Sequence, residues 1–191
     1  QRIMEEVEWK ILPEAVKLFC EDKLTVKDNK VYRIAGQQSN TYIDVISYYD
    51  IESNTETTLE ITFPTILSDF GNAQYNDYVY IFAGATGSKG TLAQDKIYRI
   101  DLNTLEITLL DATCQRGLGV TSCRVGNYIY TFGGGYVPPG MSWFYLKTIT
   151  MFDIETETIT TLSAELVNAN YIIYQQRRVY HSPIEKKKDG N

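Results

Sequence analysis

The residue types that could perform chemistry are few in this chain and scattered along it. His181 is its single histidine, and the three cysteines are Cys20, Cys114 and Cys123. A structural zinc site needs four ligands at short spacings, and no histidine stands near Cys114 or Cys123 in the sequence. We therefore expect no metal site and no cofactor, and we interpret Cys123 as a small core residue of an inner strand.

A glycine-rich stretch from Gly84 to Thr91 has the composition of a phosphate-binding loop. A true loop of this kind has two glycines separated by four residues, followed by Lys-Ser or Lys-Thr at the start of a helix. Here Lys89 is followed by Gly90, and a strand is expected to follow rather than a helix. The stretch therefore does not predict nucleotide binding.

One pair of carboxylates, Glu155 and Glu157, has the close spacing of an acid/base pair. The first has counterparts at Glu52 and Asn103, which follow the same local pattern in earlier parts of the chain. Repetition in a turn marks these residues as turn and surface residues. With no catalytic constellation in the sequence, we expect that this chain is not an enzyme.

The elements that would have to position any site come from an internal repeat of about fifty residues. Each unit has a strand-like dipeptide, a small-residue step, an aspartate block and a closing leucine, in that order. The dipeptides are Val31-Tyr32, Val79-Tyr80, Ile129-Tyr130 and Val179-Tyr180. The later features are Ala35-Gly36, Ala83-Gly84 and Gly133-Gly134, then Asp50, Asp101 and Asp153, then Leu59, Leu110 and Leu162. Repeats of this length indicate stacked units that cannot bury their apolar faces alone.

Each unit contains short runs rich in Tyr, Val, Ile and Thr, separated by turn residues, which predicts an all-β fold. The sequence has 15 tyrosines in 191 residues, and tyrosine is favoured in strands. In the third unit we expect four strands and one long loop. The strands are residues 120–125, 128–132, 145–153 and 157–162, and the loop is 135–144. Four antiparallel strands per unit favour a β-propeller over a sandwich or a barrel.

These residues resemble the kelch repeat, in which a strand ends in two glycines and is followed by an aromatic residue, a tryptophan and a closing leucine. The glycine pair stands complete at Gly133-Gly134. The aromatic position holds Tyr49 and Phe152, and the tryptophan position is kept at Trp9. The resemblance covers residues 9–182 and implies a propeller of about six blades.

The resemblance and the repeat together predict the domain organisation. Residues 1–182 are expected to form a kelch-type propeller segment of about three and a half blades, with four-stranded antiparallel blades. The three complete blades are residues 14–62, 63–110 and 111–163, and a partial blade is 164–182. Residues 6–12 are a strand of an adjoining blade, and residues 183–191 are a polar tail. The remaining blades would lie elsewhere in a longer polypeptide or in a partner chain. Alternatively, the strand at Trp9 completes the blade begun at Ala169 and closes a four-blade ring.

Charge and composition exclude several partner classes. The net charge is −6, and the one basic run, Lys186 to Lys188, lies in the polar tail; a duplex-binding protein needs clustered cations. We therefore expect no nucleic-acid partner.

No run of 18 apolar residues occurs, so no membrane span is expected. The odd cysteine count and the absence of an Asn-x-Ser/Thr site favour a cytoplasmic or other intracellular location.

Binding residues of a propeller concentrate on its loops, because the rigid sheets fix the positions of those loops. The loop between the second and third strand of each unit varies, over residues 37–41, 85–95 and 135–144. In kelch proteins the linkers between blades, here 63–69 and 111–119, lie on the same face, as the resemblance implies. Aromatic residues are enriched at interface hot spots. The residues expected to bind a partner are Tyr136, Met141, Trp143, Phe144, Arg116, Gln115, Lys89, Gln37 and Asn40.

These features predict a non-catalytic protein–protein interaction module that displays loops on a propeller scaffold. Trp143, Phe144 and Tyr136 would be its apolar anchors, unless Trp143 and Phe144 fold back over the blade as a local cap. A second hypothesis is a structural subunit of a large assembly, in which missing residues or a partner complete the propeller. A third is an enzyme or small-sugar binder that uses the central pocket of a complete propeller.

Overall fold

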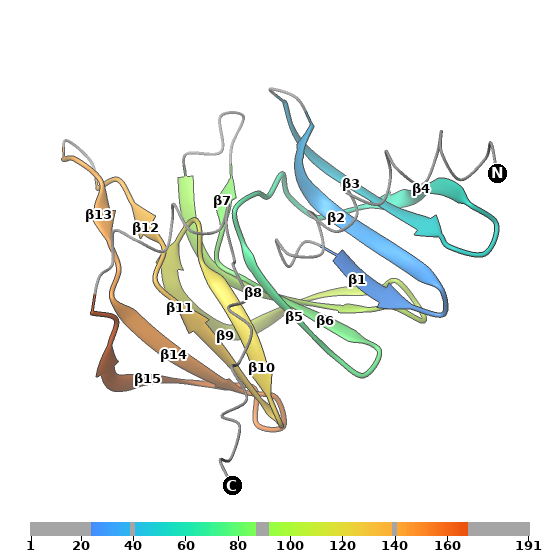
Figure 1. Ribbon diagram of the computed structural model, residues 1–191. Coiled ribbons are helices and arrows are strands. Elements are labelled where there is room, and N and C mark those ends of the chain that lie inside the picture. The colour runs from blue at the N-terminus through green and yellow to red at the C-terminus, as the bar shows by residue number, and fades with distance from the viewer. Residues whose placement is uncertain (1–23, 39–40, 87–91, 139–140, 168–191) are drawn as a thin grey trace, which may run out of the picture.

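The computed structural model describes residues 24–38, 41–86, 92–138 and 141–167 (Figure 1). Every regular element in these ranges is a β-strand, and all strand pairs are antiparallel. The all-β prediction is therefore confirmed for the described part of the chain. The strand expected at 6–12, the partial blade beyond 167 and the polar tail at 183–191 lie outside the described residues.

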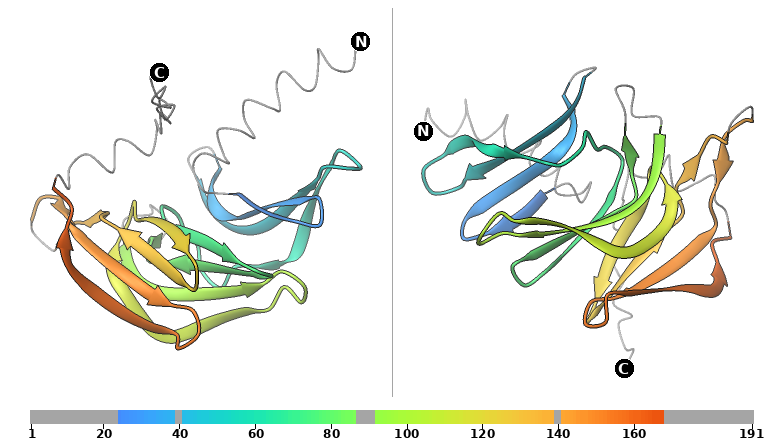
Figure 2. Two further views of the ribbon diagram at one scale, coloured as in Figure 1. Left: turned by 60° about the horizontal axis from the view of Figure 1, so that its bottom comes forward. Right: turned by 180° about the vertical axis from the view of Figure 1, so that it is seen from behind.

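Three four-stranded meanders follow one another along the chain, each built in sequence order (Figures 1 and 2). The first sheet contains β1 (Leu24–Lys27), β2 (Lys30–Gln38), β3 (Thr41–Asp50) and β4 (Thr55–Thr62). The second sheet contains β5 (Gly71–Tyr75), β6 (Tyr78–Phe82), β8 (Leu92–Asp101) and β9 (Ile107–Gly117), with β7 (Ala85–Thr86) paired to the start of β8. The third sheet contains β10 (Thr121–Val125), β11 (Tyr128–Phe132), β14 (Thr148–Asp153) and β15 (Thr158–Glu165). A separate pair joins β12 (Gly135–Tyr136) to β13 (Phe144–Tyr145).

The aspartate of the sequence repeat closes the turn between the third and fourth strand of each sheet. Asp50, Asp101 and Asp153 each accept two backbone N–H bonds on Oδ1, from residues two and three positions later. The distances lie between 2.7 and 3.3 Å. This local carboxylate turn is a property of aspartate and asparagine, and it explains why the repeat places an aspartate there.

Two hydrophobic cores lie between consecutive sheets. The first joins the β1–β4 sheet to the β5–β9 sheet and contains, among others, Ile34, Ile46, Val79, Ile81 and Ile100. The second joins the β5–β9 sheet to the third sheet and contains, among others, Tyr80, Phe82, Ile129, Phe152 and Ile154. The middle sheet therefore buries both of its faces, which a sheet of a soluble protein does only when it has neighbours on both sides.

The linkers between sheets form backbone hydrogen bonds that repeat with the sequence. Gly36 and Gly84 donate their N–H groups to linker carbonyls, at Leu67 and Gly117, both at 2.8 Å. The next linker residue in each case forms a two-way bridge to the following sheet, Ser68 with Ala85 and Leu118 with Gly135. The repeat therefore specifies how one sheet is attached to the next, in addition to the strands themselves.

The small-residue step is needed because the linker passes close to it. A Cβ on Gly84 would lie 2.8 Å from the carbonyl oxygen of Ser68, and one on Gly134 would lie 2.8 Å from Cγ2 of Val120. Both glycines also have positive φ, +98° and +87°, which other residues adopt at a cost. At Gly84 and Gly134 a larger residue would therefore collide with the linker.

The strand boundaries differ most from the expected ones in two regions. β9 runs from Ile107 to Gly117, so residues 111–117, expected as a linker, continue the strand by pairing with β8 up to Gln94. The expected strand 145–153 is divided into β13 and β14, because the Leu146 N–H turns away to donate to the Gly134 carbonyl at 2.9 Å.

The interpretation of Cys123 as a core residue is wrong, because its side chain is exposed on β10. Cys114 is the buried cysteine, within the second core. Strand alternation puts Cys123 on the opposite face of the third sheet from the buried Ser122. No helix in the described ranges combines the length and hydropathy that crossing a bilayer would require.

Candidate partner-binding surface

The loop with the aromatic residues forms a hairpin, which we call the aromatic hairpin and define as the described residues between Gly135 and Tyr145. Its strands β12 and β13 pair Gly135 with Tyr145 and Tyr136 with Phe144. Its base is tied to the scaffold on both sides, by the bridge between Gly135 and Leu118 and by the bond from Leu146 N–H to Gly134. The hairpin therefore projects from a fixed base (Figure 1).

Two ring contacts order the side chains of the aromatic hairpin. Tyr136 and Phe144 pack across the strand pair with ring centroids 5.6 Å apart and planes inclined by 55°. Trp143 and Tyr145 stack at 6.2 Å, with only 18° between their planes. Offset and tilted ring pairs of this kind are favourable beyond the area they bury. Within each of the two pairs, the rings therefore hold each other in position before any partner binds.

The rings remain accessible despite these contacts. Trp143 is 46% exposed and Phe144 53% exposed, and Val137 and Met141 are exposed beside them. Trp143 contacts its own hairpin at Gly135, where a Cβ would lie 3.3 Å from its Cε3 atom. Its support thus comes from the hairpin strands, and the two rings leave about half of their surface open to solvent.

The polar residues predicted beside the hairpin lie at its base. Gln115 and Arg116 belong to the end of β9 rather than to a linker loop, and they directly precede the segment that bridges to Gly135. Arg116 Nη2 lies 3.5 Å from Asp95 Oδ2, and the Arg116 side chain is mostly exposed. An exposed pair of this kind contributes little to stability, so its guanidinium is available to a bound partner.

One residue that sequence reasoning did not single out lies in the same region. Leu92, the first residue of β8, is among the most exposed large apolar side chains of the described chain. The start of β8 and the β12–β13 hairpin lie at the same end of the molecule (Figure 1). The sequence feature that could have indicated Leu92 is its position as a single leucine after a stretch rich in Gly, Ser and Lys.

The remaining predicted partner-binding residues are described only in part. Lys89 and Asn40 lie outside the described residues. Gln37 lies in β2, where its backbone pairs with Tyr42, and its side chain is not among those described. The structure therefore brings together Tyr136, Met141, Trp143, Phe144, Gln115 and Arg116 around one hairpin and its base.

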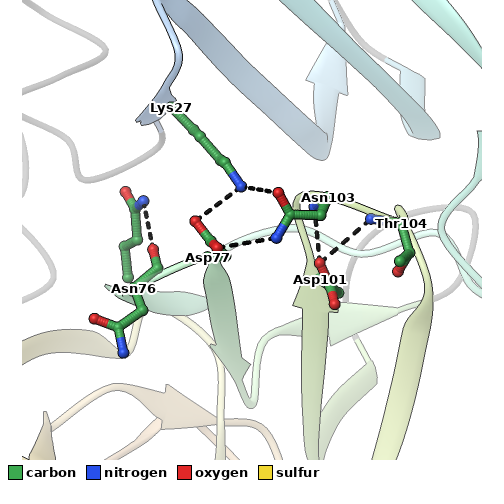
Figure 3. A network of polar contacts seen from close by, with 7 residues as sticks. Lys27, Asn76, Asp77, Asp101, Asn103 and Thr104 are labelled. Carbon is green, nitrogen blue, oxygen red and sulfur yellow. Dashed lines mark hydrogen bonds and ion pairs between the residues drawn. The ribbon is translucent and has the colours of Figure 1, made fainter.

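A network of polar side chains lies at the end of the sheets opposite the aromatic hairpin, where Lys27, Asp77 and Asn103 contact one another (Figure 3). Lys27 Nζ lies 2.8 Å from Asp77 Oδ1 and also donates to Asn103 Oδ1. Asn103 Nδ2 donates to Asp77 Oδ2 at 2.9 Å. The hydrogen bond that Lys27 donates to Asp77 lowers the pKa of Asp77 and raises the pKa of Lys27. These residues join the first sheet to the second, and we assign them a structural role.

Burial shifts the pKa of three side chains in the described chain, Cys114, Tyr80 and Tyr98. Burial raises the pKa of Cys114 to about 12, so its thiol stays protonated at neutral pH and is a poor nucleophile. Burial also raises the pKa of Tyr80 and of Tyr98. Within the described ranges, no three His, Cys, Asp or Glu side chains gather in an arrangement that could bind a metal ion.

No protein-family model matches this sequence, and no curated protein matches it. What can be said of its function therefore comes from the repeat and from the geometry of the aromatic hairpin.

Proposed function

We propose that this chain is a segment of a kelch-type β-propeller and acts as a non-catalytic, intracellular protein-interaction module. Three features support the propeller. Each sheet contains a four-stranded meander, both faces of the middle sheet are covered, and the linker hydrogen bonds recur with the sequence period. Radial repetition of such sheets is the architecture of propellers.

The aromatic hairpin is the partner-binding element in this proposal. The observation that carries it is the combination of half-exposed Trp143 and Phe144 with ring partners that fix their orientation. Tryptophan and tyrosine dominate the energy of protein interfaces, and side chains that are already ordered lose little entropy on binding. Arg116, with its exposed guanidinium at the base, would add a polar contact at the rim.

The test compares partner binding by the full-length protein, expressed in its natural source, between the wild type and the double variant Trp143→Ala, Tyr136→Ala. We expect partner recovery, quantified by mass spectrometry, to fall at least about tenfold, because loss of a hot spot costs about 2 kcal/mol or more. The matched control is Leu109→Ala, which removes a half-exposed apolar side chain on β9. Equal recovery of the partner by the wild type and the double variant would refute the proposal.

A further inference from the structure

The outer edge of β13 in the aromatic hairpin carries backbone groups with which no other strand of the described chain pairs. β12 and β13 form a sheet of two strands. Gly135 exchanges both of its backbone hydrogen bonds with Leu118, at 2.8 and 2.9 Å. Because hydrogen-bonded and non-hydrogen-bonded pairs alternate in an antiparallel ladder, Gly135 and Tyr145 are a non-hydrogen-bonded pair. The Tyr145 N–H and C=O groups therefore point away from β12, toward the open edge.

The equivalent hairpin of the second sheet shows that this construction does not require aromatic residues. The pair of β7 and the start of β8 is attached to its linker in the same way, through an antiparallel bridge and a bond to a glycine carbonyl. Its residues at the four paired positions are Ala85, Thr86, Leu92 and Ala93. None of them is aromatic. Tyr136, Phe144 and Tyr145 are therefore not explained by the building of the hairpin, and a binding role accounts for them.

Aromatic rings flank the open edge on both faces of the hairpin. Phe144 packs with Tyr136 on one face. Side chains alternate along a strand, so Tyr145 lies on the other face, where Trp143 stacks on it. Side chains of neighbouring strands touch when they lie opposite or diagonal to each other. Successive residues of a strand added beside β13 would therefore meet Phe144 on one face and the Trp143–Tyr145 pair on the other.

The chemistry of the hairpin restricts what such a strand can be. The sequence from Gly135 to Tyr145 contains no charged residue, and its exposed apolar side chains are Val137, Met141, Trp143 and Phe144. Removing a charged group of a partner from water here costs free energy that no counter-charge on the hairpin offsets. Since both faces are apolar, the matching strand has consecutive apolar residues instead of alternating apolar and charged ones.

We propose that the partner contributes an extended segment of three or more consecutive uncharged, apolar residues, which pairs with the edge of β13 as a third strand. This role rests on the proposed function of the aromatic hairpin as the partner-binding element. When a peptide adds to a sheet edge, main-chain hydrogen bonds provide affinity and alternate side chains provide specificity. Here the Tyr145 backbone provides the first and the rings on both faces provide the second. Residues with β-branched or aromatic side chains suit the added strand.

Hydrogen exchange of the full-length wild type, resolved to single residues, tests whether the edge is open. We expect the Tyr145 amide to exchange within about threefold of the rate of an unstructured amide, and the Phe144 amide, which faces Tyr136, at least about tenfold more slowly. Slow exchange at Tyr145 would overturn the proposal, because the edge would already be covered. A rate that falls as protein concentration rises would identify a second copy as the cover, and a rate independent of concentration would identify this chain itself.

Peptide selection tests the chemistry of the occupant. The probes are seven-residue peptides selected from a random library against the immobilised full-length protein. We expect the selected peptides to share the uncharged apolar run, and to bind the double variant Trp143→Ala, Tyr136→Ala at least about tenfold more weakly than the wild type. A bound peptide should slow exchange of the Tyr145 amide at least about tenfold. Failure to select any peptide that distinguishes the wild type from the double variant would overturn the proposal.

Backbone changes separate strand pairing from side-chain contact alone. N-methylation of the peptide at alternate residues, whose N–H groups face β13, should weaken binding at least about tenfold, and at the intervening residues by no more than about threefold. In the protein, Tyr145→Pro should weaken binding at least about tenfold more than the matched control Tyr145→Ala, because both lose the ring and only proline lacks the N–H.

An equal response to N-methylation at every position of the peptide would refute strand pairing, and binding by the rings would still stand. This scan leaves the protein unchanged, so it decides the question even if Tyr145→Pro disturbs the hairpin. The proposed function fails on a different readout, which is equal recovery of the natural partner by the wild type and the double variant.

Discussion

Phe152→Ala should destabilise the protein more than any surface substitution, because Phe152 lies at the centre of the second core. Its side chain is fully buried, and its ring centroid lies 5.5 Å from the rings of both Tyr80 and Phe82, which belong to the neighbouring sheet. Truncation of a buried phenylalanine costs about 3–5 kcal/mol, including the cavity that remains. The upper half of that range is expected, since the two partner rings are themselves packed and cannot collapse into the space.

Urea unfolding with hydrogen exchange as the local probe measures this effect. The free energy of unfolding should fall by about 4–5 kcal/mol with an unchanged m-value, and the loss of protection should be greatest in β6, β11 and β14. Leu109→Ala, at a half-exposed position, should change the free energy by no more than about 0.5 kcal/mol. If Phe152→Ala cost less than about 1 kcal/mol, the two sheets would not share a core, and the proposed face-to-face stacking of sheets would be refuted.

Two further predictions concern the backbone and pH. Gly84→Ala should destabilise the protein by about 1–3 kcal/mol more than Gly36→Ala, because both positions have positive φ but only Gly84 has backbone atoms within reach of a new Cβ; equal melting temperatures would contradict this. The pKa of Asp77 is lowered in the folded protein, so its contribution to stability is present above its unfolded pKa and is lost as pH falls through the folded value. The pKa of Lys27 is raised in the folded protein, so the stability that Lys27 contributes is present below its unfolded pKa and is lost as pH rises through its folded pKa. Asp77→Asn should therefore flatten the stability profile in both of those pH ranges, as urea midpoints across pH would show.

The sequence was sufficient to predict the strands because each unit carries its own local signals. Asp50, Asp101 and Asp153 build their turns from a single side chain and the next backbone amides, and such contacts depend on local sequence only. The alternation of Tyr128, Ile129 and Tyr130 likewise defines a strand without reference to any neighbour.

The parts that could not be predicted depend on contacts between distant segments. The division between β13 and β14 results from a hydrogen bond between Leu146 and Gly134, and nothing in the adjacent residues marks it. Likewise, Cys123 and Ala73 have equivalent places in their units, yet Ala73 packs against a core while Cys123 is exposed in the described chain. Whether such a position is core or surface is decided by the neighbouring sheet, and the residue type alone does not reveal it.

The scaffold and the aromatic hairpin have separate energetic requirements, and this separation favours a display function. The three sheets are joined by cores and linker bonds to which Trp143 and Phe144 do not belong. The hairpin is joined to the scaffold by backbone hydrogen bonds at Leu118 and Gly134, and its rings pack against one another in two pairs. Substitution of its exposed rings should therefore leave the core contacts of the scaffold intact. A surface that can change its side chains at little cost to folding is well suited to selecting a partner, whereas a catalytic site requires several groups fixed at mutual distances by the core.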